Sequence, residues 1–114
     1  MTEQQISKLL HAFRMYGFSY SDDHEKAMIG ALEILRERQG EYQRGTFFTD
    51  VAKEVGVSQD LMESVYYALV GAQDREGNEV FDYGTSPRGM WMNTYGATFY
   101  DTIMQEDDNA THKV

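Results

Sequence analysis

The stretch FFTDVAKEVGVSQDLMESVYYAL, residues Phe47–Leu69, decides the fold of this chain. Small or branched apolar residues at Val51, Ala52 and Val55 are followed by a glycine, Gly56, and apolar residues then resume at Val57, Met62, Val65 and Leu69. Ala52 lets two helices approach closely, and Gly56 can adopt the positive φ of a tight turn. The pattern therefore predicts two short helices, about residues 50–55 and 58–71, joined by a turn.

The rest of the chain predicts three further helices and a β-hairpin. Apolar residues recur at helical spacing over residues 3–16 and again over residues 22–39. Two segments rich in β-forming residues, 79–83 and 89–93, flank a Gly/Pro loop and predict a hairpin. A last helix is expected after a cap at Thr94, and Thr49 is the expected cap of the helix that precedes Gly56. A short strand is expected near Thr46–Phe48.

Helix, helix-turn-helix, β-hairpin and helix follow one another as in winged helix domains. From about His24 to Met104 the sequence resembles this superfamily. The resemblance is carried by the VA..VGV....M..V pattern from Val51 to Val65, by a hairpin with its tip at Thr85–Arg88, and by the run Met92-Asn-Thr-Tyr-Gly96.

The resemblance implies an α+β fold that is mostly α, in which a winged helix domain has an additional N-terminal helix and a C-terminal helix. The expected domain organisation is an N-terminal amphipathic helix in residues 1–20, the winged helix domain in 21–105, and an acidic, disordered tail in 106–114. Terminal helices of this superfamily often pack across a dimer interface, so a homodimer is expected.

Composition limits the classes of function. The chain has no cysteine, which excludes disulfides and thiolate chemistry, and no apolar run reaches the roughly 18 residues of a membrane span. The histidines His11, His24 and His112 are dispersed, and no glycine loop precedes a helix in the way that phosphate binding requires. We therefore expect a cytoplasmic protein that is not an enzyme and has no cofactor, metal site or membrane contact.

In the winged helix superfamily the second helix of the helix-turn-helix normally reads DNA, and the hairpin touches the duplex beside it. The residues that would carry such contacts here are Lys53, Ser58, Gln59, Ser64 and Arg88. Lys53, Arg44 and Arg88 would supply the cations of this surface, against the roughly 6–10 phosphate contacts of a strongly salt-dependent binder. DNA binding is therefore the alternative hypothesis rather than the preferred one.

The charge of the chain favours a protein partner. The formal net charge is −9, and from Glu54 to Asp74 the charged residues are all acidic. Tyrosine and tryptophan are enriched at protein interfaces because they bury a large area and keep a polar group. Of the adjacent Tyr66 and Tyr67 at most one can point fully into the core, and either Trp91 or its two methionine neighbours must face away from it. We expect a regulatory protein that binds another protein through Asp60, Glu63, Tyr67 and Trp91. The acidic charge suits a basic protein as this partner.

Overall fold

A computed structural model describes residues 2–13, 22–39, 47–85 and 88–112 of the chain. Five helices and one hairpin follow in the order α1 (Glu3–Ala12), α2 (Asp22–Glu37), α3 (Phe48–Val55), α4 (Gln59–Leu69), β1 (Phe81–Thr85), β2 (Arg88–Met92) and α5 (Thr94–His112). The fold class is α+β, mostly α, as the sequence predicts. The end of the first expected helix, residues 14–16, lies outside the described residues.

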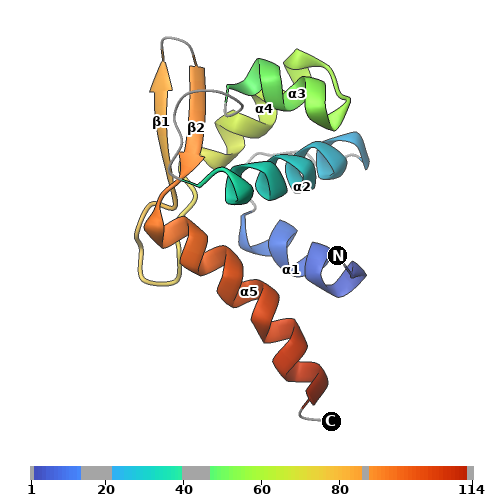
Figure 1. The fold of residues 1–114 in the computed structure, drawn as a ribbon, viewed down its shortest axis with the longest axis vertical. Helices are drawn as coiled ribbons and strands as arrows, with labels where there is room; N and C mark the ends of the chain where they lie inside the picture. The colour runs from blue at the N-terminus through green and yellow to red at the C-terminus, as the bar shows by residue number, and fades with distance from the viewer. Residues whose placement is uncertain (1, 14–21, 40–46, 86–87, 113–114) are drawn as a thin grey trace.

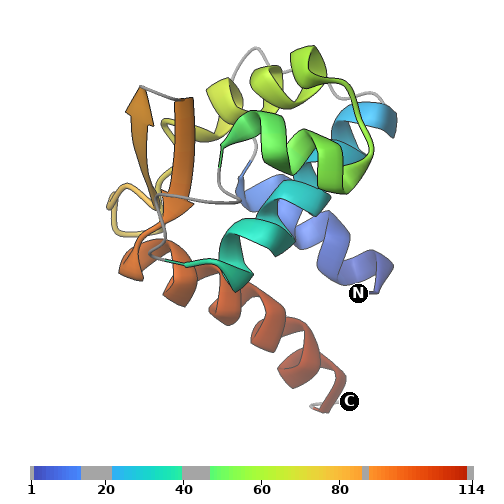
Figure 2. The same cartoon turned by 45° about the horizontal axis from the view of Figure 1, so that its top comes forward.

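Helix α2 occupies the centre of the molecule (Figure 1). It packs against α1, α3, α4 and strand β2. The α3–α4 pair lies on one side of α2, and α1 with the first half of α5 lies on the other, as both views show (Figures 1 and 2). The second half of α5 extends beyond the rest of the protein. This half includes residues 106–112, which belong to the segment that the sequence analysis assigns to a disordered tail.

The tight turn between α3 and α4 has the predicted geometry. Gly56 has a φ of +84° and ends α3, and its N–H donates to the carbonyl of Ala52 at 2.9 Å. Ser58 begins the next helix because its hydroxyl oxygen accepts a hydrogen bond from the N–H of Leu61 at 3.1 Å. Such caps satisfy amide groups that the first turn of a helix leaves without partners.

Two of the predicted helix caps are wrong. Helix α3 begins at Phe48, so Thr49 lies inside the helix, and Phe47 precedes the helix without a side-chain cap. Phe47 instead forms an antiparallel bridge with Gly89 of β2, which places the chain beside the hairpin immediately before α3. At the start of α5, the side chain of Asn93 accepts a hydrogen bond from the N–H of Gly96 at 2.9 Å, so Asn93 and not Thr94 is the cap.

The hairpin pairs β1 and β2 in antiparallel register, with Phe81 opposite Met92 and Tyr83 opposite Met90. The strands begin and end within two residues of the predicted segments on the β1 side and within one residue on the β2 side. Pairing continues to Thr85 and Arg88, so the connection is shorter than the loop predicted from the sequence. Residues 86–87 lie outside the described residues.

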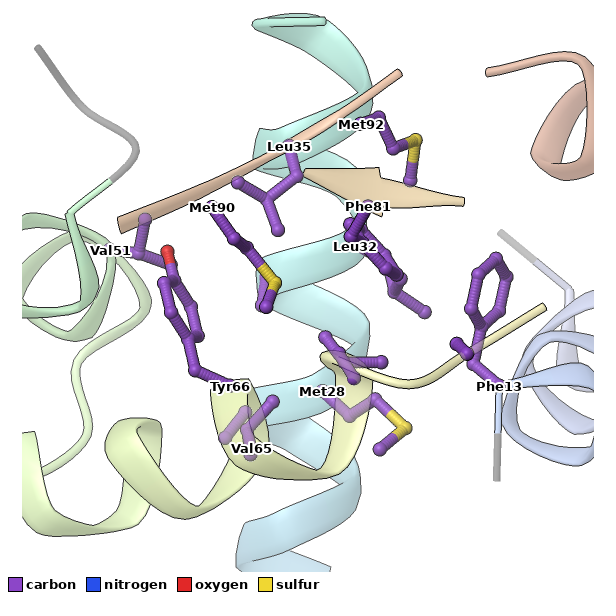
Figure 3. Close-up of a cluster of buried hydrophobic side chains, with 14 of the residues drawn as sticks. Phe13, Met28, Leu32, Leu35, Val51, Val65, Tyr66, Phe81, Met90 and Met92 are labelled. Carbon is purple, nitrogen blue, oxygen red and sulfur yellow. The ribbon is translucent and has the colours of Figure 1, made fainter. Parts of the chain in front are cut away.

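All of these elements share one hydrophobic core (Figure 3). Met28, Leu32 and Leu35 of α2 lie at its centre and are fully buried. Phe13, directly after α1, contacts the ring of Phe81 with a centroid distance of 5.8 Å. The N-terminal helix is therefore held against the hairpin by the core.

Candidate functional site

The outward face of α4 presents polar and acidic side chains followed by a tyrosine. Asp60, Ser64 and Tyr67 recur at helical spacing and are exposed, and Glu63 on the same face is partly exposed. The opposite face of α4 is buried against the core through Met62, Val65, Tyr66 and Leu69. The helix therefore separates a core face from a solvent face along its whole length.

The adjacent tyrosines of α4 have opposite environments. Tyr66 is 2% exposed, and its ring meets that of Phe48 nearly edge-on at a centroid distance of 6.4 Å. Burial raises the pKa of the Tyr66 hydroxyl far above its usual value, and the nearby carboxylate of Asp50 raises it further. Tyr67 is 58% exposed. The two residues thus divide as the helical geometry requires, and Tyr67 is left on the surface.

The hairpin also separates its side chains into two sets. Met90 and Met92 are buried in the core, which turns Trp91 toward the other face, where it pairs with the exposed Asp82. Trp91 is partly buried on that outer face. The sequence left open whether the tryptophan or the methionines face the core, and the structure places the methionines there.

Tyr83 is an exposed aromatic residue that the sequence analysis did not select. It pairs with Met90 and thus lies on the inner face of the hairpin, yet it is 54% exposed. Tyr83 lies two residues before the end of β1, near the tip of the hairpin, where its side chain meets solvent instead of the core. Strand alternation alone assigns Tyr83 to the core, because it does not tell which inward-facing strand positions the helices leave uncovered.

Tyr67 and Tyr83 line the same groove, which lies between the second half of α4 and the hairpin. Its volume is about 240 Å³, and its other walls come from Tyr66, Val70, Met90, Gly84 and Gly89. Gly84 and Gly89 are partners across the hairpin and have no side chains to fill the space. The result is an apolar, aromatic groove, here called the tyrosine groove, that is bordered by two exposed phenol rings.

The residues predicted to bind a protein do not all lie on one surface of the structure. Tyr67 lines the tyrosine groove, while Asp60 and Glu63 lie earlier on the same face of α4. Trp91 lies on the opposite face of the hairpin from Met90, which lines the groove. The tyrosine groove therefore includes Tyr67 of the predicted set, and Trp91 belongs to a different surface.

The DNA-contact candidates occupy the first half of the same region. Lys53, Ser58, Gln59 and Ser64 are all exposed. The side chain of Arg88, at the start of β2, lies outside the described residues, as does Arg44. Two other arginines are held in ion pairs, since Arg38 binds Glu54 at 2.8 Å and Arg36 binds Asp101 at 2.7 Å. Among the described residues of this candidate set, Lys53 is therefore the cation, and α4 itself has none.

Within the described ranges, no three His, Asp or Glu side chains are grouped closely enough to hold a metal ion. Over the same residues, no helix combines the length and the apolar character that crossing a bilayer demands. Comparison of the chain with protein-family models, with curated proteins and with solved structures finds no match in any of the three.

Proposed function

We propose that this chain is a non-catalytic, cytoplasmic regulatory protein of the winged helix type that binds another protein through α4 and the hairpin. The order of α2, α3, α4, the β1–β2 hairpin and α5 supports the winged helix assignment, as do the left-handed Gly56 at the turn and the bridge from Phe47 to Gly89. The proposal includes a homodimer, which the projecting second half of α5 supports.

The tyrosine groove carries the proposal of a protein partner. Exposed large apolar side chains are costly to leave in water, and Tyr67 and Tyr83 are two of the three exposed large hydrophobic residues among those that the structure describes. Both border one concave apolar surface. Burial of tyrosine rings in such a groove is a common source of affinity between proteins, because the ring is rigid and its hydroxyl can keep a hydrogen bond.

The charge beside the groove favours a basic partner. Asp60 lies two turns and Glu63 one turn before Tyr67 on α4, and α4 has no Lys or Arg. Complementary charge speeds the encounter of two proteins and penalises partners of the wrong sign. The same carboxylates would repel the phosphates of a duplex.

DNA binding remains the second candidate, and the exposure of Lys53, Ser58, Gln59 and Ser64 supports it. In this mode α4 would enter the major groove and Gln59 would contact a base. Mixed duplex DNA titrated at about 50 mM and about 200 mM salt separates the two candidates. Micromolar binding that is lost at the higher salt and in Arg88→Ala would favour the DNA regulator.

The protein-binding proposal is tested by quantitative affinity purification from extract of the source organism, followed by binding measurements with each purified candidate. Tyr67→Ala/Tyr83→Ala should lose the partner, and Asp60→Lys/Glu63→Lys should lose it if the partner is basic. Tyr95→Ala is the matched control, because Tyr95 is 55% exposed but belongs to α5. A partner that binds the double tyrosine variant as well as it binds the original chain would contradict the proposal.

A further inference from the structure

A second groove lies between α1, α2 and α3, and it shares no residue with the tyrosine groove. Its volume is about 640 Å³. Ile6 of α1, Ile29 and Ile34 of α2 and Val55 of α3 form its apolar surface, and all four are partly exposed. We call it the α2 groove, because residues from Asp22 to Glu37 line it along the whole of that helix.

Gly30 sets the position of one wall of this groove. A Cβ atom at residue 30 would lie 2.7 Å from Cγ2 of Val55, which is closer than such atoms can approach. The absence of a side chain therefore lets the end of α3 rest on α2 and places Val55 beside Ile29 and Ile34 in the same groove. The apolar surface thus joins residues of the first three helices of the chain.

Carboxylates dominate the rim of the α2 groove. Five acidic residues and one lysine line it, a formal charge of −4: Asp22, Glu25, Glu33, Glu37 and Glu54 with Lys26. Glu54 is bound to Arg38 at 2.8 Å. The other four carboxylates are exposed side chains of α2. An apolar surface inside an acidic rim is complementary to a cationic amphipathic segment.

Asp22 and Glu25 lie in the first turn of α2, where acidic groups stabilise a helix, but helix stability does not account for Glu33 and Glu37. Glu33 and Glu37 are four residues apart on one face of the helix, a like-charge spacing that destabilises a helix. Glu37 is also the last residue of α2, where the negative end of the helix dipole disfavours a carboxylate. A cationic partner bound along this side of α2 would relieve both unfavourable interactions.

We propose that the α2 groove binds a basic amphipathic helix of a partner protein. Helix α2 has 16 residues and is about 24 Å long, so the partner helix would have about four turns. Its leucine-like side chains would cover Ile6, Ile29 and Val55, and its Lys or Arg residues would face the carboxylates. A second copy of this chain fits poorly, because its net charge of −9 opposes the acidic rim.

The test uses the full chain and a synthetic peptide of about 18 residues, roughly 27 Å as a helix, made of Leu and Lys with the leucines along one stripe. A second peptide has the same composition in an order that gives no apolar stripe. Fluorescence anisotropy at about 50 mM salt should give at least about tenfold tighter binding of the amphipathic peptide, which corresponds to about 1.4 kcal/mol.

Matched charge reversals then locate the site. Glu33→Lys/Glu37→Lys should weaken binding of the amphipathic peptide at least about tenfold. Glu3→Lys/Glu79→Lys makes the same change in net charge at exposed positions outside the groove and should leave the affinity within about threefold. If the α2 variant loses its cooperative thermal transition, Glu33→Gln/Glu37→Gln replaces it with the same expected direction.

Equal binding of the two peptides, or equal weakening by the two charge reversals, would overturn the proposal, because either result means attraction by net charge alone. The inference does not depend on the proposed function. Asp60→Lys/Glu63→Lys should leave peptide affinity at the level of the Glu3→Lys/Glu79→Lys control, whereas the Glu33 and Glu37 substitutions should leave a partner of the tyrosine groove bound.

Discussion

The guanidinium group of Arg36 on α2 binds both carboxylate oxygens of Asp101 on α5. Its Nε lies 2.9 Å from Oδ1, and one terminal nitrogen lies 2.7 Å from Oδ2. This two-pronged geometry is the strongest form of an arginine–carboxylate pair. The residues are 65 positions apart in the sequence, so the pair links α5 to the central helix.

Asp101→Asn should lower the free energy of unfolding at neutral pH by less than about 1 kcal/mol, because both side chains are more than one-third exposed and solvent screens the pair. The hydrogen bond from Arg36 lowers the pKa of Asp101 below its unfolded value of 3.8. The stabilisation is therefore complete above that value and is lost as the pH falls through the lower, folded pKa. Urea titrations at about pH 7 and about pH 2 measure it. If the original chain and Asp101→Asn differed by the same unfolding free energy at both pH values, the result would contradict the expectation.

The buried hydroxyl of Tyr66 should make the folded protein less stable in alkaline solution. Its buried hydroxyl has a pKa raised above the ordinary value of 10.0, so the neutral form is favoured in the folded state. The resulting stabilisation is fully present below that value and is lost as the pH rises above it. Tyr66→Phe should make the urea midpoint depend less steeply on pH above about 10, and Tyr67→Phe, one residue away and exposed, should not. Identical slopes for the two variants would count against the burial of the Tyr66 hydroxyl.

The glycines at positions 56 and 96 should respond differently to alanine. Gly56 has a positive φ with free space where a Cβ would lie, so Gly56→Ala should cost about 1–2 kcal/mol from backbone conformation alone. Gly96, at the start of α5, lies against the carbonyl oxygen of Val80, and a Cβ there would overlap that oxygen. Gly96→Ala should therefore lower the melting temperature more than Gly56→Ala. Thermal unfolding followed by circular dichroism makes the comparison, and the reverse order would refute it.

Phe13 should be the residue through which the N-terminal helix contributes most to stability. It is fully buried, and besides Phe81 its ring meets Phe99 of α5 edge-on at 5.4 Å. Phe13→Ala should cost about 3–5 kcal/mol in the free energy of unfolding, and Phe13→Leu clearly less. Urea unfolding of both variants tests this. A loss below about 1 kcal/mol for the alanine variant would mean that α1 is not part of the cooperative core.

Local patterns were sufficient to predict much of the fold. The turn at Gly56, the cap at Ser58 and the division between Tyr66 and Tyr67 each depend on residues within one or two helical turns of one another. The caps at Phe47 and Asn93 were missed because both residues also bond to chain that is distant in sequence. Phe47 bridges to Gly89, and the side chain of Asn93 donates to the carbonyl of Glu79 at 2.8 Å.

The two grooves could not be predicted in the same way. The tyrosine groove joins Tyr67 of α4 and Tyr83 of β1, and the α2 groove joins Ile6, Ile29 and Val55 from three helices. Amphipathic spacing identifies each helix but does not give the distance at which neighbouring helices pack. Sequence analysis therefore selected Tyr67 and overlooked Tyr83, although the two rings border one surface.

Trp91 gives the protein a spectroscopic reporter of its own. It is the single tryptophan of the chain, and it lies on the outer face of β2, back to back with the tyrosine groove. Excitation at the long-wavelength edge of the aromatic absorption selects tryptophan over the eight tyrosines, so the emission comes from the hairpin alone. A ligand that bends or orders the hairpin would shift this emission without any label, whereas occupation of the α2 groove would leave it unchanged.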